Sequence, residues 1–251
     1  MTSMTILHHR TEGSGPTVVL LHAGVADLRM WDTQAEELHI DHTVVRCDLR
    51  GYGRTPLEPG SDHGDAEDVL ALLDHLAVDT FALVGASYGG YVALQVASAV
   101  PDRVERLVLL DPLAEVAEPD DRLRAFWERE GALLEAGDLD SATDLNVATW
   151  LGPEAAQDHR DLLWRMQRNA FEVQVAAGDV EGRELPVDLA RITAPTTVVV
   201  GDHDLPFFLE TARILAERLP RAELVELAWA AHLPSLERPF ETAHLVRASL
   251  E

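Results

Sequence analysis

The sequence predicts an α/β fold, in which a mostly parallel β-sheet is covered by helices on both faces. Short apolar runs rich in β-branched residues alternate along the chain with longer runs whose apolar residues recur at helical spacing. The short runs are continuous rather than alternating, as expected of strands that a parallel sheet buries on both faces. The alternation stops once, between Asp111 and Pro195, where only helical patterns occur. We therefore expect a sheet-based core domain with a helical insertion.

Six apolar runs are predicted to be the parallel strands. Each is bounded by turn-forming residues such as Gly, Pro or Asp. A further run near the start, 4–10, is predicted to be an antiparallel edge strand. The six runs are 17–24, 43–47, 81–86, 106–111, 196–202 and 222–227.

Helices are predicted wherever apolar residues gather on one face of a 3.6-residue period and charged residues on the other. Between the strands these helices cover the sheet, and in the insertion they pack on one another. The expected domains are a core of 1–112 and 186–251 and a helical cap, or lid, of 113–185. The core helices are 66–76, 87–99, 208–219 and 239–250, and the cap helices are 120–136, 139–150 and 154–177.

The composition restricts the partners of the protein. The 251 residues include 44 Asp and Glu against 20 Lys and Arg, a formal charge of −24. Such a surface repels polyanions, so neither nucleic acid nor an anionic membrane is expected as a partner. The single cysteine, Cys47, cannot form an internal disulfide, and no zinc-type spacing of Cys and His occurs. Without a signal-peptide pattern or an apolar run of bilayer length, the protein is expected to be cytoplasmic.

The stretch "LVGASYGGYV", residues 83–92, contains a Gly-x-Ser-x-Gly motif centred on Ser87. It joins a predicted strand to a predicted helix, so the serine is expected on a sharp turn with strained backbone angles. Gly85 and Gly89 allow that turn to close against the sheet and the helix. The serine oxygen would then lie at the positive N-terminus of the helix. We predict that Ser87 is a nucleophile.

A serine hydroxyl needs a base, and the base needs an orienting acid. Of the eleven histidines, only His232 lies after a candidate acid, past the last predicted strand and in the loop before the final predicted helix. Two aspartates, Asp202 and Asp204, lie at or just past the end of the strand 196–202. Both are within reach of a loop histidine, so the residue pattern leaves the acid open between them.

Together these motifs resemble the α/β-hydrolase superfamily, in its lidded branch of small esterases, enol-lactonases, C–C bond hydrolases and cofactor-free haloperoxidase-like enzymes. "VVLLHAGVADLRMWD" is similar to the family's His-Gly oxyanion loop, "CDLRGYGRT" to its Asp-x-Arg-Gly-x-Gly-x-Ser segment, "GDHD" to its acid turn and "AHLPSLERP" to its histidine loop. The resemblance covers nearly the whole chain and implies the α/β-hydrolase fold with a helical cap. Three positions depart from the pattern: Ala23 and Ala231 replace glycines, and Thr55 replaces a serine.

The resemblance also implies roles for single residues. The acid is Asp204, three places after Gly201, where a residue in the turn can face back across the strand ends. The backbone N–H groups of Gly24 and Tyr88 form the oxyanion hole, and His22 is a structural hydrogen-bonding residue of its loop. The cap covers the serine, so aromatic residues of the cap are expected to bind substrate, with Trp31 as packing or a pocket wall. The cap aromatics are Phe126, Trp127, Trp150 and Trp164.

The expected function is hydrolysis of a carboxylic ester or lactone of a small organic molecule through an acyl-enzyme, with no metal or cofactor. A C–C bond hydrolase, a cofactor-free perhydrolase and a non-catalytic receptor for a small ligand remain alternatives. Branches of the superfamily with an aspartate nucleophile are disfavoured, because position 87 is serine. The sequence leaves the substrate and the oligomeric state open.

Overall fold

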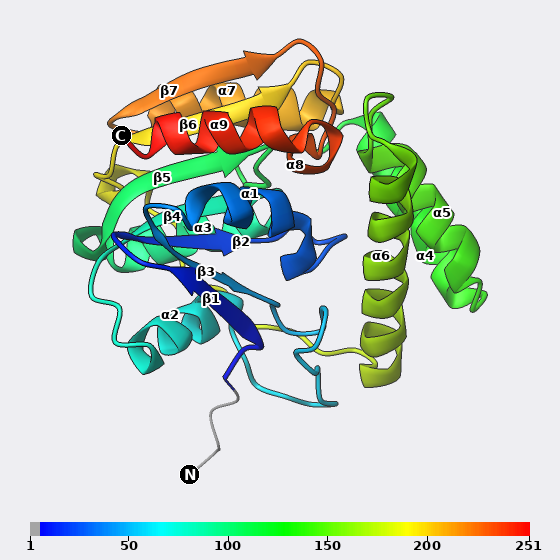
Figure 1. Cartoon of the computed structure of the whole chain (residues 1–251). Coiled ribbons are helices and arrows are strands. Elements are labelled where there is room, and N and C mark those ends of the chain that lie inside the picture. Colours follow the sequence, from blue (N-terminus) through cyan, green and yellow to red (C-terminus); the bar gives the residue numbers. More distant parts are fainter. Residues whose placement is uncertain (1–5) are drawn as a thin grey trace.

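A seven-stranded sheet forms the centre of the computed structural model, which describes residues 6–251 (Figure 1). Its strand order is β1-β3-β2-β4-β5-β6-β7, and all neighbouring pairs are parallel except β1 with β3. The mostly parallel α/β fold predicted from the sequence is therefore confirmed. The strands are β1 (His9–Gly13), β2 (Thr17–Leu21), β3 (Thr43–Cys47), β4 (Phe81–Ala86), β5 (Val104–Leu110), β6 (Thr196–Gly201) and β7 (Ala222–Leu227).

The antiparallel edge strand lies later in the chain than predicted. It begins at His9 and pairs with β3, whereas the apolar run that suggested it starts at position 4. Positions 4 and 5 lie outside the described residues. Three of the five residues of β1 are exposed and the other two are half-buried, so the sequence of this edge strand carries little of the apolar signal that identifies the inner strands.

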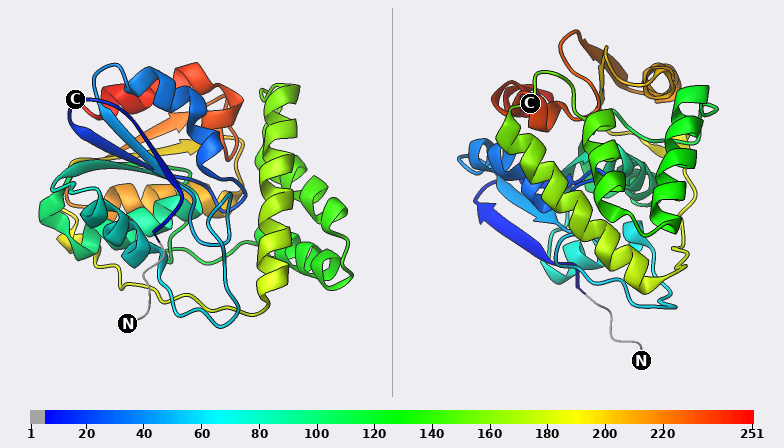
Figure 2. Two further views of the ribbon diagram at one scale, coloured as in Figure 1. Left: turned by 60° about the horizontal axis from the view of Figure 1, so that its bottom comes forward. Right: turned by 90° about the vertical axis from the view of Figure 1, so that its right-hand side faces the viewer.

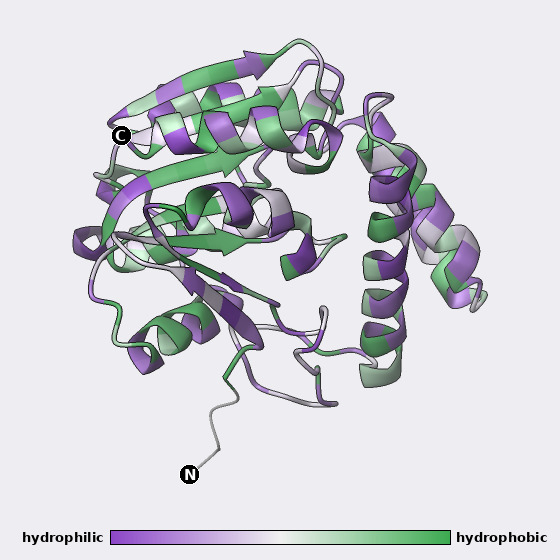
Figure 3. Ribbon diagram, viewed as in Figure 1, coloured by the Kyte–Doolittle hydropathy of each residue, from purple (hydrophilic) through white to green (hydrophobic). Residues whose placement is uncertain are grey.

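Two hydrophobic cores lie on opposite faces of the sheet. Successive residues of β2 alternate between them: Val19 and Leu21 pack against one set of helices, and Val18 and Leu20 against the other. This period of two, with both faces buried, explains why the inner strands are continuous apolar runs. Figure 3 shows the same strands as mainly hydrophobic and the covering helices as mixed. One core contains residues of α2 (Asp65–His75), α3 (Tyr88–Ala99) and α7 (Pro206–Arg218), and the other of α1 (Asp32–Leu38) and α9 (Pro239–Ser249).

Three further helices lie beyond the carboxyl ends of the strands, between β5 and β6 in the chain (Figures 1 and 2). They are α4 (Asp121–Glu135), α5 (Leu139–Trp150) and α6 (Gln157–Ala177). Aspartates just before α4 and α5 accept hydrogen bonds from the first backbone N–H groups of those helices, which fixes where they start. The end of the sheet where these helices lie is the end where the loops of β4, β6 and β7 meet. Among residues 6–251, no helix combines the length and the apolar character that a membrane crossing requires.

Candidate active site

Ser87 occupies the turn between β4 and α3, with backbone angles φ 50° and ψ −115°. Such angles are unfavourable for any residue with a side chain, so the surrounding structure must hold them. The two motif glycines show how tight the turn is. A Cβ built on Gly85 would lie 2.3 Å from the carbonyl oxygen of Gly89, and one built on Gly89 would lie 2.4 Å from that of Leu21. Backbone cannot give way at such distances, so both positions require glycine.

His232 lies in the loop between β7 and the short helix α8 (Pro234–Glu237) and links two of the predicted residues. Its Nε2 is 2.8 Å from Ser87 Oγ, and its Nδ1 is 2.7 Å from Asp204 Oδ2. The carboxylate accepts a hydrogen bond from Nδ1–H, which leaves the lone pair of Nε2 facing the serine hydroxyl. The imidazole is almost wholly buried, whereas Ser87 is half-buried.

The structure separates the two candidate acids clearly. Asp204 is buried in the turn after β6, where its Oδ1 also accepts a hydrogen bond from the N–H of Leu205 at 2.6 Å. Asp202 is exposed, and its backbone N–H donates to the carbonyl of Leu227. Of the two, only Asp204 contacts His232 among the described residues.

Gly24 and Tyr88 lie side by side next to the serine. A Cβ built on Gly24 would lie 3.3 Å from the Cβ of Tyr88. Within residues 6–251, neither backbone N–H donates a hydrogen bond to another backbone or side-chain group. His22 shapes this loop as expected: its Nδ1 donates to the carbonyl of Ala23 at 2.8 Å, and its Nε2 accepts the N–H of Leu49 at 2.9 Å. With both nitrogens engaged, His22 is a structural residue rather than a second base.

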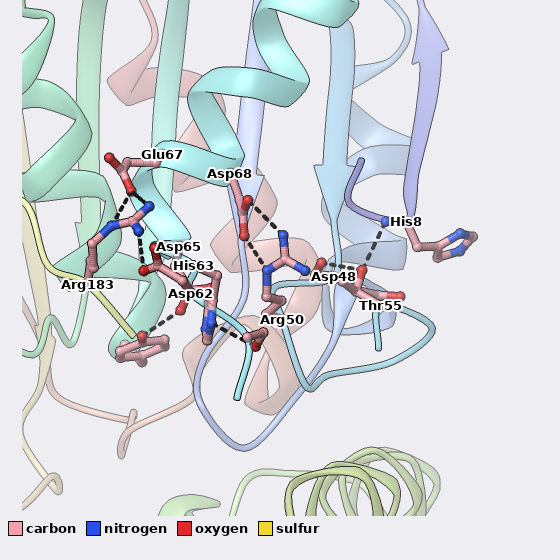
Figure 4. A network of polar contacts seen from close by, with 12 residues as sticks. His8, Asp48, Arg50, Thr55, Asp62, His63, Asp65, Glu67, Asp68 and Arg183 are labelled. Carbon is pink, nitrogen blue, oxygen red and sulfur yellow. Dashed lines mark hydrogen bonds and ion pairs between the residues drawn. The ribbon is translucent and has the colours of Figure 1, made fainter. Parts of the chain in front are cut away.

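The three departures from the family pattern fit the fold without strain. Neither Ala23 nor Ala231 is among the described non-glycine residues with a positive φ, so alanine is tolerated at both positions. Thr55 performs the task of a serine with its hydroxyl, which donates to the carbonyl of Asp48 at 2.7 Å and accepts the N–H of His8 at 2.9 Å (Figure 4). The Asp48 carboxylate in turn accepts the N–H of Leu28, which ties this segment to the loop of Gly24.

A polar cavity of about 320 Å³ lies beside Tyr88 and Tyr52. The Tyr88 hydroxyl donates to Asp65 Oδ2 at 2.6 Å, and Tyr52 packs edge-on against His22 with ring centroids 5.0 Å apart. Burial raises the pKa of the Asp65 carboxyl above its ordinary value. Arg50 and Arg183, which also line this cavity, are each paired with carboxylates, Arg50 with Asp68 and Arg183 with Asp62 and Glu67 (Figure 4). The cavity therefore has no unpaired arginine to attract an anion.

Aromatic rings pack directly on the histidine. Trp150, at the end of α5, lies with its ring centroid 4.6 Å from that of His232, and Phe126 of α4 packs edge-on against Trp150 at 4.8 Å. Phe208 of α7 is closer still, at 4.2 Å from the imidazole. Phe208 was not predicted to be a site residue. The feature of the sequence that could have indicated Phe208 is its position in the helix that follows the acid turn.

The other predicted substrate-binding residues do not reach the histidine. Trp31 is completely buried in the same hydrophobic core as residues of α1 and α9. Trp127 is 46% exposed, because α4 turns Leu123 and Phe126 inward instead. Trp164 is held by a hydrogen bond from its Nε1 to Asp144 at the surface, at 2.8 Å.

Glu237 holds the backbone of the histidine loop, a role that was not predicted. Its two carboxylate oxygens accept the backbone N–H groups of Ala231 at 2.9 Å and Leu233 at 3.2 Å, on either side of His232. Burial raises the pKa of this carboxyl above its ordinary value. The same two hydrogen bonds fix the backbone that carries the imidazole.

Asp111 is a second buried carboxylate near His232 that was not predicted. It directly follows β5, and its Oδ1 accepts the N–H of Gly201 at 2.8 Å. One carboxylate oxygen each of Asp111 and Asp204 and one ring nitrogen of His232, the atoms that could bind a metal ion, lie within 4.8 Å of one another. In this arrangement Nδ1 of His232 donates its proton to Asp204, so it has no lone pair to offer a metal ion. Ser87, Asp111, Asp204 and His232 follow β4, β5, β6 and β7, which are successive neighbours in the sheet.

A strained serine at a strand–helix turn, hydrogen-bonded to a histidine and through it to an aspartate, has the geometry of a Ser-His-Asp triad at the end of a parallel sheet. The profile of the family described as alpha/beta hydrolase fold matches residues 16–239, and the chain belongs to that family.

Relatives and solved structures of this family align along most of the chain. The 3-oxoadipate enol-lactonase 2 of Acinetobacter baylyi is 24% identical over 98% of this chain and 93% of its own length. A putative carbamate hydrolase, RutD, of Agrobacterium fabrum is 29% identical over 93% of this chain and 92% of its own. The structure of a thermophilic esterase from Thermogutta terrifontis superposes with a TM-score of 0.82 at 28% identity, covering 97% of this chain and 92% of the esterase.

Proposed function

We propose that the protein hydrolyses a carboxylic ester or lactone of a small organic molecule through an acyl-enzyme on Ser87. The observation that carries the proposal is the hydrogen-bonded row from Ser87 through His232 to Asp204, with distances of 2.8 and 2.7 Å. An esterase and an enol-lactonase among the similar proteins support this choice of substrate class.

In the first half of the proposed reaction, Ser87 Oγ attacks the carbonyl carbon while its proton passes to Nε2 of His232. Asp204 holds the imidazole in the required tautomer and stabilises the imidazolium that forms. The N–H groups of Gly24 and Tyr88 would bind the developing oxyanion, and the loss of one such donor typically costs about 3–4 kcal/mol in the transition state. Nε2–H then protonates the leaving alkoxide as the C–O bond breaks, which leaves the acyl group on the serine.

In the second half, water takes the place of the alcohol. His232 accepts a proton from the water as its oxygen attacks the acyl carbon, and the acid is released when Ser87 recovers its proton. In a lactone the leaving alkoxide stays attached to the acyl group, so the product is a single hydroxy acid.

We propose that the segment 113–185 is the cap of this site. Its support is the position of α4–α6 beyond the strand ends and the contact of Trp150 with His232. The substrate would then have an aromatic wall on the histidine side, formed by Trp150, Phe126 and Phe208. On the side of Tyr88 it would meet the polar cavity.

Ester turnover and covalent labelling test the proposal together. We expect the wild type to hydrolyse p-nitrophenyl acetate and to be labelled by a fluorophosphonate at Ser87, located by mass spectrometry. Ser87→Ala, which removes only the nucleophilic oxygen, should lose both while its melting temperature stays near that of the wild type. Wild-type turnover in the folded variant would contradict the proposed role of Ser87.

A panel of esters, lactones and vinylogous diketones then separates the enzymatic alternatives. Preferred cleavage of the diketones would favour a C–C bond hydrolase. Binding of a panel compound without turnover of any would favour a receptor.

A further inference from the structure

Asp111 is a buried carboxylate that the proposed reaction does not use. Its side chain has no exposed surface, and its backbone φ of 45° lies in the left-handed region. Aspartate and asparagine tolerate that region better than other residues with a side chain. While Oδ1 accepts the N–H of Gly201, Oδ2 is buried with no hydrogen-bond partner among residues 6–251.

The surroundings of Asp111 are negatively charged. Asp204 and His232 lie in the same cluster as Asp111, and the charge of Glu237 also acts on Asp111. The ion pairs found in the described part of the chain do not include Asp111, so no cation balances it. Two ionised carboxylates cannot share a buried site of this size without a strong mutual penalty.

Hydrogen bonds decide which of the two carboxyl groups keeps its charge. Asp204 accepts two donors, the N–H of Leu205 and Nδ1–H of His232, whereas Asp111 accepts one. More donors stabilise the ionised form. Burial, followed by the charge of Asp204, raises the pKa of Asp111 well above its ordinary value.

We propose that Asp111 is a neutral carboxylic acid that donates a hydrogen bond to Asp204 and acts as a positioning residue of the proposed active site. The proposal rests on the function proposed above. The Oδ2–H of Asp111 holds the carboxylate of Asp204 in the orientation that meets His232. It also spreads the negative charge of Asp204 without adding a second charge, so less charge holds a proton on the histidine.

Two substitutions separate this role from a merely structural one. Asp111→Asn keeps one donor and one acceptor in the same positions, so we expect kcat/KM and its pH profile to match those of the wild type. Asp111→Ala removes the donor. Its kcat should fall about tenfold with KM nearly unchanged, the loss expected for one hydrogen bond to a charged group. The acid limb of its pH profile should move to higher pH, because the charge of Asp204 is then less dispersed.

Two kinetic results would overturn the proposal. If Asp111 were ionised, Asp111→Asn would remove a negative charge beside His232, and the acid limb would move to lower pH. If Asp111 only filled space, both folded variants would keep the wild-type profile.

An infrared measurement tests the proton itself and needs neither turnover nor a folded alanine variant. The difference spectrum of wild type minus Asp111→Asn at neutral pH should show the C=O stretch of a protonated carboxylic acid. Carboxylate bands in its place would overturn the proposal. A protein that shows the acid band but hydrolyses no ester would contradict the proposed function and leave the neutral Asp111 standing, so the two failures are distinguishable.

Discussion

Replacing Asp204 with asparagine removes one of the two carboxylate oxygens that accept hydrogen bonds in the chain Ser87–His232–Asp204. The two oxygens of Asp204 accept the N–H of Leu205 at 2.6 Å and Nδ1–H of His232 at 2.7 Å. Asparagine has one oxygen and one amide nitrogen, so it can accept only one of these donors. If its oxygen stays with Leu205, its NH₂ faces Nδ1, and the imidazole must carry its proton on Nε2. The histidine then points a proton, and not a lone pair, at Ser87.

The size of the effect depends on which donor the asparagine satisfies. With the wrong tautomer we expect turnover to fall by about 10⁴, as in the serine-protease template. That loss corresponds to about 5 kcal/mol of transition-state stabilisation. If the oxygen turned to His232 instead, the N–H of Leu205 would face another donor, and the folded state would lose about 1–3 kcal/mol.

The assay compares Asp204→Asn with Asp202→Asn, the same chemical change two residues earlier on an exposed side chain. Turnover of p-nitrophenyl acetate and thermal melting are measured for both purified variants. Asp202→Asn should stay within about twofold of the wild type, since exposed substitutions change free energies by about 0.5 kcal/mol or less. A larger loss of activity in folded Asp202→Asn than in Asp204→Asn would show that Asp202 is the acid.

Two further substitutions test the aromatic wall and the fold. Trp150→Phe should change the ranking of acyl and alcohol groups in an ester panel, because Trp150 packs on His232, whereas Trp127→Phe at an exposed position should not; equal rankings in both folded variants would contradict the wall. Arg29→Met should lower the free energy of unfolding at pH 7 by about 2 kcal/mol, because it leaves the buried Asp27 unpaired. Burial alone would raise the pKa of Asp27, but the hydrogen bonds and charge of Arg29 bring it below its ordinary value. A depressed pKa stabilises the fold above the unfolded value and ceases to do so as the pH falls through the folded one. The gap between Arg29→Met and the wild type in denaturant melts should therefore narrow in acid, and a gap that stays constant would contradict the ion pair.

The elements that could be predicted from the sequence are those whose apolar pattern lies entirely within the element itself. The bounds of β3 and β4 agree with the apolar runs at both ends, because strands buried on both faces are continuous apolar runs. The bounds of β7 also agree, although this edge strand has only one buried residue. Helix α1 was not predicted. Among its seven residues, Ala35 and Leu38 are the buried apolar ones. It also buries Gln34, whose amide donates to the carbonyls of Ser235 and Pro239, about 200 residues away in the chain. No pattern in the sequence around α1 indicates this contact.

The same distinction applies to the candidate site. The turn around Ser87 is encoded by neighbouring glycines, so its geometry could be predicted from ten residues. Asp111 and Phe208 reach His232 only through the packing of separate elements, and no motif marks either residue. Glu237 lies on α8, directly after the histidine loop, but the sequence does not show that its carboxylate turns back to the backbone of that loop. The rotation of α4, which buries Phe126 and exposes Trp127, likewise depends on what the helix packs against.

The order of the site residues along neighbouring strands also bears on how the chain folds. Ser87 and His232 are 145 residues apart, and β4, β5, β6 and β7 must all be paired before their side chains meet. Parallel pairing over such separations is slow compared with helix formation, because each crossover has to close a long loop first. During refolding, the time course of recovered catalysis would therefore report when the last long-range strand pairing forms. The circular dichroism signal of the helices would recover earlier.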